Sequence, residues 1–282
     1  MMVAKEVALE IERRFEKQVA YVWRLHELGR RAIEDGHAVA TTGDVSHRLA
    51  LSMLSRGTSA LHSVELLFCG GLETDAMSAL RIIAELLIDY EWIWKEDREA
   101  RIKLFVEHIM IINQRKLVRW INPPGQPVNT NLADKLFAQI DPAHRPHGID
   151  TAEKYMQWIE AEYQRVRGNY DEFKSWAGIS IRKRAQQTGL MDTYDLPFAL
   201  GSEATHSGAA TLTGHYRIED GTVSMVYGPT VPTSAWVLAL ASQVYGHLLE
   251  VVADHLGFAA LRSELGALGG EFLAVFATVT AT

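Results

Sequence analysis

Cysteine is almost absent from this sequence, and its scarcity excludes one class of protein. Cys69 is the single cysteine among 282 residues, so the chain can form no disulfide within itself. Disulfide frameworks are typical of secreted proteins, whereas reduced thiols are typical of the cytosol. Cys69 comes at the apolar end of a predicted helix, and we interpret it as a small core residue rather than a reactive thiol.

Long uninterrupted apolar runs are also missing. The N-terminal segment is charged throughout, so no signal peptide is predicted there. The stretch 231–253 contains Glu250, and the stretch 265–282 is interrupted by glycines. Neither is a clean run of about twenty apolar residues, which a membrane-spanning helix requires. We therefore expect core helices in a cytoplasmic protein without a membrane partner.

An excess of positive charge is the third absence. The formal net charge is -7, which argues against a protein whose whole surface binds nucleic acid and leaves only a local basic groove for such a partner. The triplet Arg182-Lys183-Arg184 is the densest basic run, and we interpret it as a solvated helix face rather than a phosphate contact. The hydrophobic and charged fractions, 48% and 22%, are those of a soluble globular protein.

Sequence motifs for common cofactors are missing as well. The chain has no glycine-rich phosphate loop and no G-x-S-x-G nucleophile turn. Carboxylate bundles that bind paired metals use Glu-x-x-His on two helices, whereas here the order is reversed, His62-Ser-Val-Glu65. We therefore predict no cofactor and no metal site.

Apolar residues recur with helical spacing along most of the chain. This pattern predicts an all-α protein, a bundle of about eight helices in a single domain over residues 1–282. Asp220-Gly221, between alternating apolar positions, predicts one small β-hairpin near 216–227. A long helix is predicted at 3–35, followed by a polar connector. The core is predicted at 47–120 and 151–213, interrupted by a proline-rich insert at 121–150, and its last helix covers 192–213. C-terminal helices are predicted at 232–278. The insert is either a lid or binding loop or a plain surface insertion.

The stretch 72–95 is predicted to be the central helix. Apolar side chains cover almost its whole circumference, which is typical of a buried helix. Arg81, Glu85 and Asp89 are nevertheless spaced at i, i+4 and i+8, so they form one narrow charged stripe on it. Buried charges are costly unless they are paired or used in chemistry. The stripe is therefore our first candidate site.

The helix at 47–69 should fold back against the central helix through a tight Gly70-Gly71 turn. Antiparallel register then places Arg56 level with Glu85 and His62 near the level of Arg81. We predict an Arg56–Glu85 ion pair, and we count Arg56 and His62 among the substrate-binding candidates.

A second polar group follows at Tyr194, Ser202 and His206. Ser202 and His206 are four residues apart and so share one helix face, with Tyr194 two turns earlier. Histidine can act as a general acid or base near neutral pH, although a histidine on a packed helix is more often a hydrogen-bonded core residue.

Two motifs in these segments resemble a bacterial all-helical family of unknown function. The family pattern R-x-x-x-E matches Arg81 to Glu85, and its later Y…S-x-x-x-H matches Tyr194 and Ser202 to His206. Ser207 and Gly208 continue the match, which covers 53–120 and 179–208. The resemblance implies that the two motifs meet in space, and it supplies no substrate. It also suggests an analogy with HEPN-type helical ribonucleases, which place a histidine four to six residues after an arginine on one helix.

Three functions remain open on these residues. The first is an enzyme or binding protein that acts on a small polar or anionic molecule, with Glu85, His206 and Arg81 catalytic and with Asp89, Tyr194, Ser202, Arg56 and His62 binding the substrate. The second is a HEPN-like ribonuclease of a toxin or phage-defence system, which predicts a homodimer and a basic groove beside His206. The third is a non-catalytic interaction protein in which the charged stripe fixes helix register.

Overall fold

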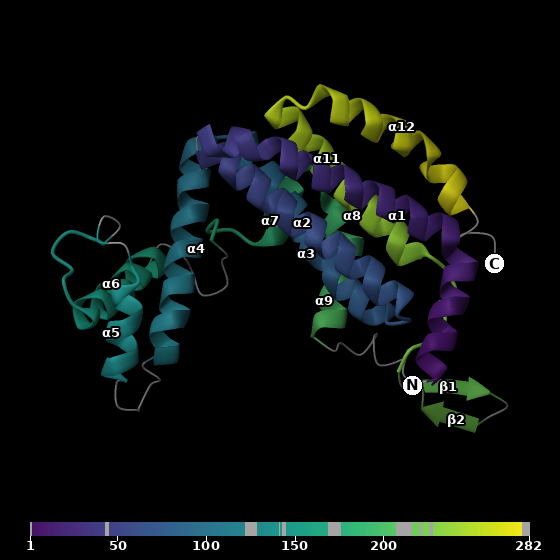
Figure 1. Ribbon diagram of the computed structural model, residues 1–282, viewed down its shortest axis with the longest axis horizontal. Coiled ribbons are helices and arrows are strands. Elements are labelled where there is room, and N and C mark those ends of the chain that lie inside the picture. The colour runs from purple at the N-terminus through teal and green to yellow at the C-terminus, as the bar shows by residue number, and fades with distance from the viewer. Residues whose placement is uncertain are drawn as a thin grey trace. The chain divides into compact units, whose positions relative to one another are not determined.

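A computed structural model of the chain describes residues 2–42, 45–121, 129–140, 142, 145–168, 176–206, 216–219, 222–225 and 228–277. It is all-helical apart from one pair of short strands, which confirms the predicted class (Figure 1). The contacts divide the chain into two compact units, one made of residues 1–96 and 181–282 and the other of residues 97–180.

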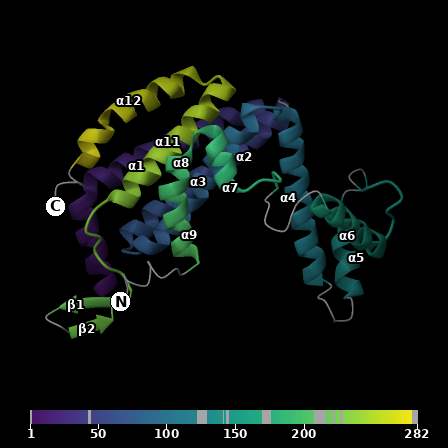
Figure 2. The ribbon, with the colours of Figure 1, turned by 180° about the vertical axis from the view of Figure 1, so that it is seen from behind.

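Helix α3 (Glu73–Lys95) is the core helix of the first unit, as predicted. Leu80, Ile83, Leu87 and Ile93 on it are 0% exposed. Helices α2 (Val45–Cys69) and α11 (Trp236–Leu256) pack against it, together with the shorter helices between residues 181 and 206 (Figure 2). Burial of its apolar surface against these helices stabilises the unit.

The α2–α3 turn forms at the predicted glycines. Gly71 has φ +74°, a left-handed conformation that glycine adopts without a steric cost, and its N–H donates to the Phe68 carbonyl. A Cβ atom at Gly71 would lie 2.7 Å from the Thr230 carbonyl oxygen and 2.8 Å from Val7. The turn therefore needs glycine both for its backbone angle and for the close approach of two distant segments.

Helix α1 (Met2–Thr42) is longer than predicted. The sequence analysis placed a polar connector after residue 35, but the helix continues to Thr42, where alanine residues support helical structure. It bends at Phe15, whose φ and ψ of -119° and 22° are not helical. Ile11 and Phe15 are buried on its apolar face, as the spacing predicted.

Helix α11 (Trp236–Leu256) packs against α1, α2 and α3. Tyr245 on it is fully buried, and its hydroxyl lies 2.6 Å from Oγ1 of Thr58 on α2. Gly29 on α1 lies against the same hydroxyl, and a Cβ there would overlap it. α11 is also long and apolar enough to span a membrane, but 56% of its most apolar window is buried against the rest of the unit. The core helix of a globular protein can have the same length and composition, so these two properties are weak support for a membrane span.

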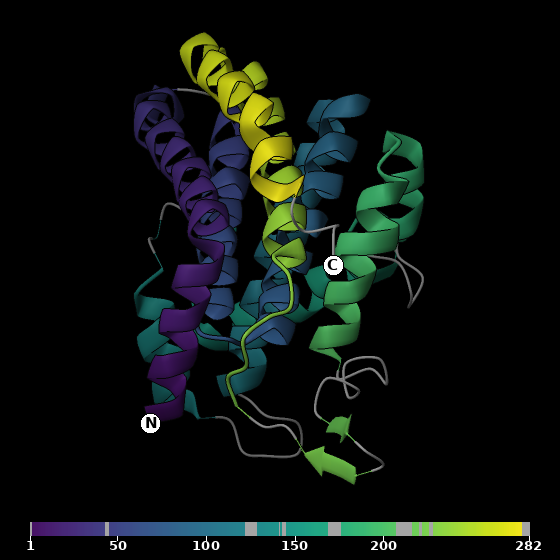
Figure 3. The same cartoon turned by 90° about the vertical axis from the view of Figure 1, so that its right-hand side faces the viewer.

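Helix α12 (Ala259–Phe276) follows α11 after Gly257 and lies beside α1 and α11 (Figure 3). Two ion pairs join it to α1: Arg24 to Glu271 at 2.6 Å and Arg31 to Glu264 at 2.5 Å. These side chains are largely exposed, so the pairs fix position more than they add stability.

The stretch predicted as one helix over 192–213 is divided. It forms α8 (Met191–Thr193), the π-helix η2 (Tyr194–Phe198) and α9 (Ala199–Thr205), preceded by α7 (Ile181–Thr188). Pro197 lies inside η2, and proline cannot donate the hydrogen bond that an α-helix requires. The described residues therefore form more helices than the eight or so predicted. The expected continuation to residue 213, with Ser207 and Gly208, lies outside the described residues.

The strands β1 (Tyr216–Glu219) and β2 (Thr222–Met225) pair antiparallel, with Tyr216 opposite Met225 and Glu219 opposite Thr222. The Asp220-Gly221 turn between them lies outside the described residues. No other strand is present in the described part of the chain.

The second unit contains α4 (Arg98–Ile121), α5 (Thr130–Ala138) and α6 (Ala152–Gly168). Arg115 on α4 pairs with Glu160 on α6 at 3.0 Å, and its guanidinium lies over the Tyr163 ring. The proline-rich insert falls here, with 122–128, 141, 143 and 144 outside the described residues. The helix predicted over 151–175 is described as far as Gly168.

Candidate functional site

The charged stripe on α3 divides into two parts with different partners. Asp89, at one end, is buried and forms an ion pair with Arg184 on α7. Oδ1 of Asp89 lies 2.7 Å from Nε of Arg184. Arg184 is itself only 1% exposed, the largest fully buried side chain described. The prediction that its basic triplet is a solvated face is therefore wrong for Arg184. Asp89 holds α7 on α3, and we remove it from the substrate-binding residues.

Arg81, at the other end of the stripe, meets His206. Nη1 of Arg81 lies 3.4 Å from Nε2 of His206, which is the residue after the last turn of α9. A guanidinium group has donors only, so the imidazole Nε2 is the acceptor and Nδ1 carries the ring proton in this arrangement. Arg81 of the R-x-x-x-E motif and His206 of the S-x-x-x-H motif thus lie side by side, as the resemblance implied for these two residues.

Aromatic rings hold the Arg81 side chain from a second direction. The guanidinium carbon lies 5.0 Å from the centre of the Phe198 ring, within the range of a cation–π contact. Tyr194 stacks on Phe198 with ring centroids 5.1 Å apart. Nε of Arg81 is buried without a hydrogen-bond partner in the described part of the chain. The arginine is therefore fixed in place while part of its donor capacity is unused.

The π-helix explains how these side chains reach α3. A π turn adds one residue to a helical turn, and such turns are frequent at functional sites. Here it contains Tyr194 and Phe198, so both rings face the same way despite the proline between them. Sequence analysis selected Tyr194 and missed Phe198, although Pro197 was a visible signal that the helix could not be regular.

Gly201 brings α9 against α3. A Cβ atom at this position would overlap the Met77 carbonyl oxygen and lie 2.5 Å from Cβ of Arg81. The absence of a side chain therefore permits the two helices to touch beside Arg81. Ser202, the next residue, is half-buried, and its carbonyl accepts a hydrogen bond from the His206 N–H at 3.0 Å.

Glu85 lies one turn beyond Arg81 on the same face of α3 and is half-buried. It forms no hydrogen bond or ion pair with the described residues, so its carboxylate is available to accept or donate a proton. Arg81 and His206 thus bring an anion-binding group and a proton-transfer group into contact, and the Glu85 carboxylate lies one helical turn from Arg81.

The remaining two predicted residues lie elsewhere. Arg56 is exposed on α2 and forms no ion pair with Glu85, because its neighbour Gly57 turns towards Leu248 and Tyr245 of α11 and directs Arg56 to solvent. His62 pairs with Glu65 on its own helix at 3.3 Å, and its ring lies 5.0 Å from that of His26 on α1. The antiparallel register thus gave the correct hairpin but the wrong side-chain partners.

The segment 191–206 is acidic. Asp192, Asp195 and Glu203 are exposed on it, and it contains no lysine or arginine. These acidic side chains lie on the segment that carries His206, and they disfavour a polyanion such as RNA along it.

Metal and thiol chemistry receive no support from the described residues. Within them, no group of three or more His, Cys, Asp or Glu side chains has a geometry that could hold a metal ion. Burial raises the pKa of the Cys69 thiol to about 11, so the thiol is protonated at neutral pH. Cys69 itself is half-buried at the end of α2.

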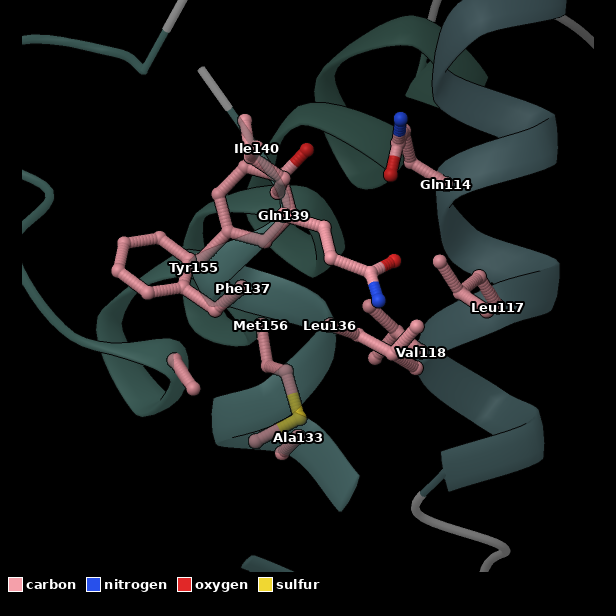
Figure 4. A pocket seen from close by; sticks show the side chains of 11 residues that line it. Gln114, Leu117, Val118, Ala133, Leu136, Phe137, Gln139, Ile140, Tyr155 and Met156 are labelled. Carbon is pink, nitrogen blue, oxygen red and sulfur yellow. The ribbon is translucent and has the colours of Figure 1, made fainter. Parts of the chain in front are cut away.

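The second unit has an apolar pocket of its own, with a volume of about 200 Å³. Leu117 and Val118 of α4 line one side, and Phe137 and Met156 line the other (Figure 4). The Gln139 amide is the polar group nearest the middle of the view. The pocket is smaller than most ligand sites and has no charged lining residue, so it is not the candidate site.

Comparison with protein families matches residues 47–223 to the model of a family of unknown function, DUF5677. The chain belongs to this family. The match covers more than half of the chain, from α2 to β2, and includes Arg81, Glu85, Tyr194, Ser202 and His206. It confirms the resemblance to a helical family of unknown function. Comparisons with curated proteins and with solved structures gave no match.

Proposed function

We propose that this protein is a cytoplasmic enzyme or binding protein that takes a small polar or anionic molecule at the patch formed by Arg81, Glu85 and His206. The contact between Arg81 and His206 at 3.4 Å carries the proposal. It brings together a fixed cation and an imidazole from helices more than one hundred residues apart in the chain. Neither side chain belongs to a buried structural pair of the kind that Asp89 and Arg184 form.

Arg81 would bind the anionic or most polar group of the ligand. Its guanidinium is oriented by the Phe198 ring, and a ligand oxygen would use the terminal Nη donors, because Nε is buried. An oxygen that takes the Nη1 donor also releases Nε2 of His206. The imidazole would then stand next to the bound group as a general base.

Glu85 would supply the second proton-transfer group. A carboxylate and an imidazole on opposite sides of a bound molecule can serve as acid and base for one reaction. Tyr194 and Ser202 lie on the same segment as His206 and would orient a polar ligand atom. Arg56, His62 and Asp89 have no part in this proposal.

A thermal-shift screen tests the proposal. The panel consists of inorganic phosphate, small carboxylates, sugar phosphates and nucleotides, each tested on the parent protein and on Arg81→Gln and His206→Gln. A ligand at one hundred times its Kd stabilises by about 2.7 kcal/mol, or roughly 5–10 °C for a domain of this size. We expect a panel member to raise the melting temperature of the parent and to lose that effect in both variants.

Arg56→Gln is the matched control, because Arg56 is an exposed arginine on the neighbouring helix. Its response to the ligand should equal that of the parent. An equal response of Arg81→Gln and the parent would contradict the proposal, as would a panel without any stabilising member.

A ribonuclease is the second candidate, because the same contact joins an arginine that could bind phosphate to a histidine that could deprotonate a ribose hydroxyl. The acidic residues on 191–206 weigh against it. Incubation of single-stranded RNA with the parent and with His206→Gln separates the two. Cleavage by the parent that His206→Gln abolishes would favour the ribonuclease over the small-molecule site.

A further inference from the structure

A cavity in the first unit lies away from the Arg81 patch, between α1, α11 and α12. Its volume is about 470 Å³, within the range of small-molecule sites. α1, α11 and α12 lie outside the segment that matches the family model, so the groove is built by parts of the chain that the family match does not cover. We call it the α11–α12 groove.

Missing side chains open the groove. Gly246 on α11 and Gly266 and Gly269 on α12 line it, and a Cβ atom at any of the three would meet nothing within 4 Å. Two helices in contact normally fill such a gap, because an empty one forfeits dispersion contacts. Here α12 is joined to α1 by two ion pairs and by a hydrogen bond from Gln18 to the Val275 carbonyl, while the gap beside α11 stays open.

A buried hydroxyl marks the inner end of the groove. Ser242 on α11 is 3% exposed and lines the cavity, and its Oγ has no hydrogen-bond partner in the described part of the chain. An unsatisfied buried hydroxyl is costly, and rotation of the Ser242 side chain about its Cα–Cβ bond would bring Oγ to a polar ligand atom in the groove that this residue lines. This observation is independent of the glycines and points to the same occupant.

The walls of the groove are apolar and aromatic. Leu25 and Tyr21 of α1 face Leu265 and Phe272 of α12, and the Tyr21 and Phe272 rings meet edge to face at 5.9 Å. Surfaces of this kind bind hydrocarbon or aromatic ligands, and aromatic faces also attract cations.

The rim carries an uncompensated negative charge. Glu250 is exposed and forms no ion pair with the described residues. Of the other lining residues, Arg262 pairs with Asp254 at 2.8 Å, and the His247 ring lies 3.3 Å from the Glu91 carboxylate. An amine head group therefore fits the rim better than a carboxylate.

Ser242, Gly246 and Glu250 follow one another at i, i+4 and i+8 along one face of α11. At a rise of about 1.5 Å per residue, the hydroxyl and the carboxylate are separated by about 12 Å along the helix. We propose that the α11–α12 groove binds an elongated apolar amine, with its protonated head at Glu250 and a polar far end at Ser242. Such a ligand has a body of about eight carbon atoms, and the proposal does not depend on the function assigned to the Arg81 patch.

The test is titration calorimetry of the full chain with three probes of similar length. These are the eight-carbon ω-amino alcohol, octylamine and octanoate. We expect saturable binding of the amino alcohol, weaker binding of octylamine, and at least tenfold weaker binding of octanoate. Glu250→Gln should lower the affinity for both amines at least threefold and leave octanoate unchanged or slightly better.

Two neighbouring glycines supply a matched pair of blocking variants. Gly269→Leu places a side chain in the groove, whereas Gly270→Leu adds the same side chain to the same helix at a position that does not line it. Both should fold, because each site is open and leucine favours helix over glycine. Gly269→Leu should abolish amine binding, and Gly270→Leu should retain it.

Several results would overturn the proposal. These are equal binding of amine and carboxylate, equal binding by Gly269→Leu and Gly270→Leu, or no saturable binding of any probe. Sedimentation of the same samples tests whether a second copy of the chain, rather than an amine, occupies the groove. If the parent is a dimer that Gly269→Leu dissociates, a second copy of the chain occupies the groove and the amine site is refuted.

Discussion

Nε of Arg184 lies 2.7 Å from Oδ1 of Asp89, and both side chains are shielded from solvent. This pair fixes α7 on the central helix and so determines where the rest of the 181–206 segment begins. A buried ion pair contributes little more to stability than well-packed apolar side chains would. Loss of one partner is nevertheless strongly destabilising, because it leaves the other charge buried without a partner. The pair is therefore structural, in contrast to the half-buried Arg81 at the other end of the stripe.

A double-mutant cycle on this pair should show strong coupling. Asp89→Leu and Arg184→Met should each lower the free energy of unfolding by about 3–5 kcal/mol. The double variant should lose much less than the sum of the two, with a coupling energy near the upper end of ~0.5–3 kcal/mol. Urea denaturation measures all four proteins, and additive losses would show that the pair is not coupled.

Gly201→Ala should separate α9 from α3. The new methyl group would overlap the Met77 carbonyl and Cβ of Arg81, both of which are tied to the α3 backbone. Overpacking of this kind costs about 1–3 kcal/mol, and it should displace His206 from Arg81. Gly270→Ala is the control, since its site is open and alanine favours helix. A Gly201→Ala protein that melts at or above the parent temperature would argue against the close approach.

The Tyr245 hydroxyl should contribute measurably to stability. Burial raises the pKa of Tyr245, so the phenol stays protonated and shares its hydrogen bond with Thr58 at 2.6 Å. Tyr245→Phe should cost about 0.5–1.5 kcal/mol in thermal or urea unfolding. Thr58 keeps a hydrogen bond to the Leu54 carbonyl, which limits the loss. A neutral effect of Tyr245→Phe would show that the hydrogen bond adds nothing.

His26 should make the protein less stable in mild acid. Burial first, and the neighbouring His62 second, lower the pKa of His26 from its ordinary value of 6.5. Below pH 6.5 the unfolded chain binds a proton that the folded protein does not, so stability falls as the pH decreases towards the native pKa of His26. His26→Gln should flatten this dependence in urea unfolding between pH 7 and about 5. His147→Gln, at an exposed histidine, should leave the slope of the parent unchanged.

Sequence patterns predicted the α2–α3 hairpin well, because its determinants are local. Two glycines set the turn, and the apolar circumference of α3 requires burial whatever surrounds it. The proximity of Arg81 and His206 was predicted only through the family resemblance. No spacing rule joins helices that far apart.

The errors have physical reasons as well. Three consecutive basic residues on α7 give no indication of which one turns inward, and only the position of Asp89 selects Arg184. The break of the 192–213 helix was readable at Pro197, whereas the π turn that carries Phe198 to Arg81 depends on packing against α3. Arg56 failed as a partner of Glu85 because register along two helices does not determine the rotation of each about its axis.

The central claim is that Arg81, Glu85 and His206 form a working site rather than a structural network. The most direct measurement is the free energy of unfolding of Glu85→Gln and His206→Gln, with Asp89→Asn as the reference for loss of a structural charge. Residues held for function are often neutral or unfavourable for stability. We predict that both site variants remain within about 0.5 kcal/mol of the parent, while Asp89→Asn loses about 3–5 kcal/mol. If Glu85→Gln and His206→Gln lose as much free energy of unfolding as Asp89→Asn, the claim is contradicted, and these residues have a structural role.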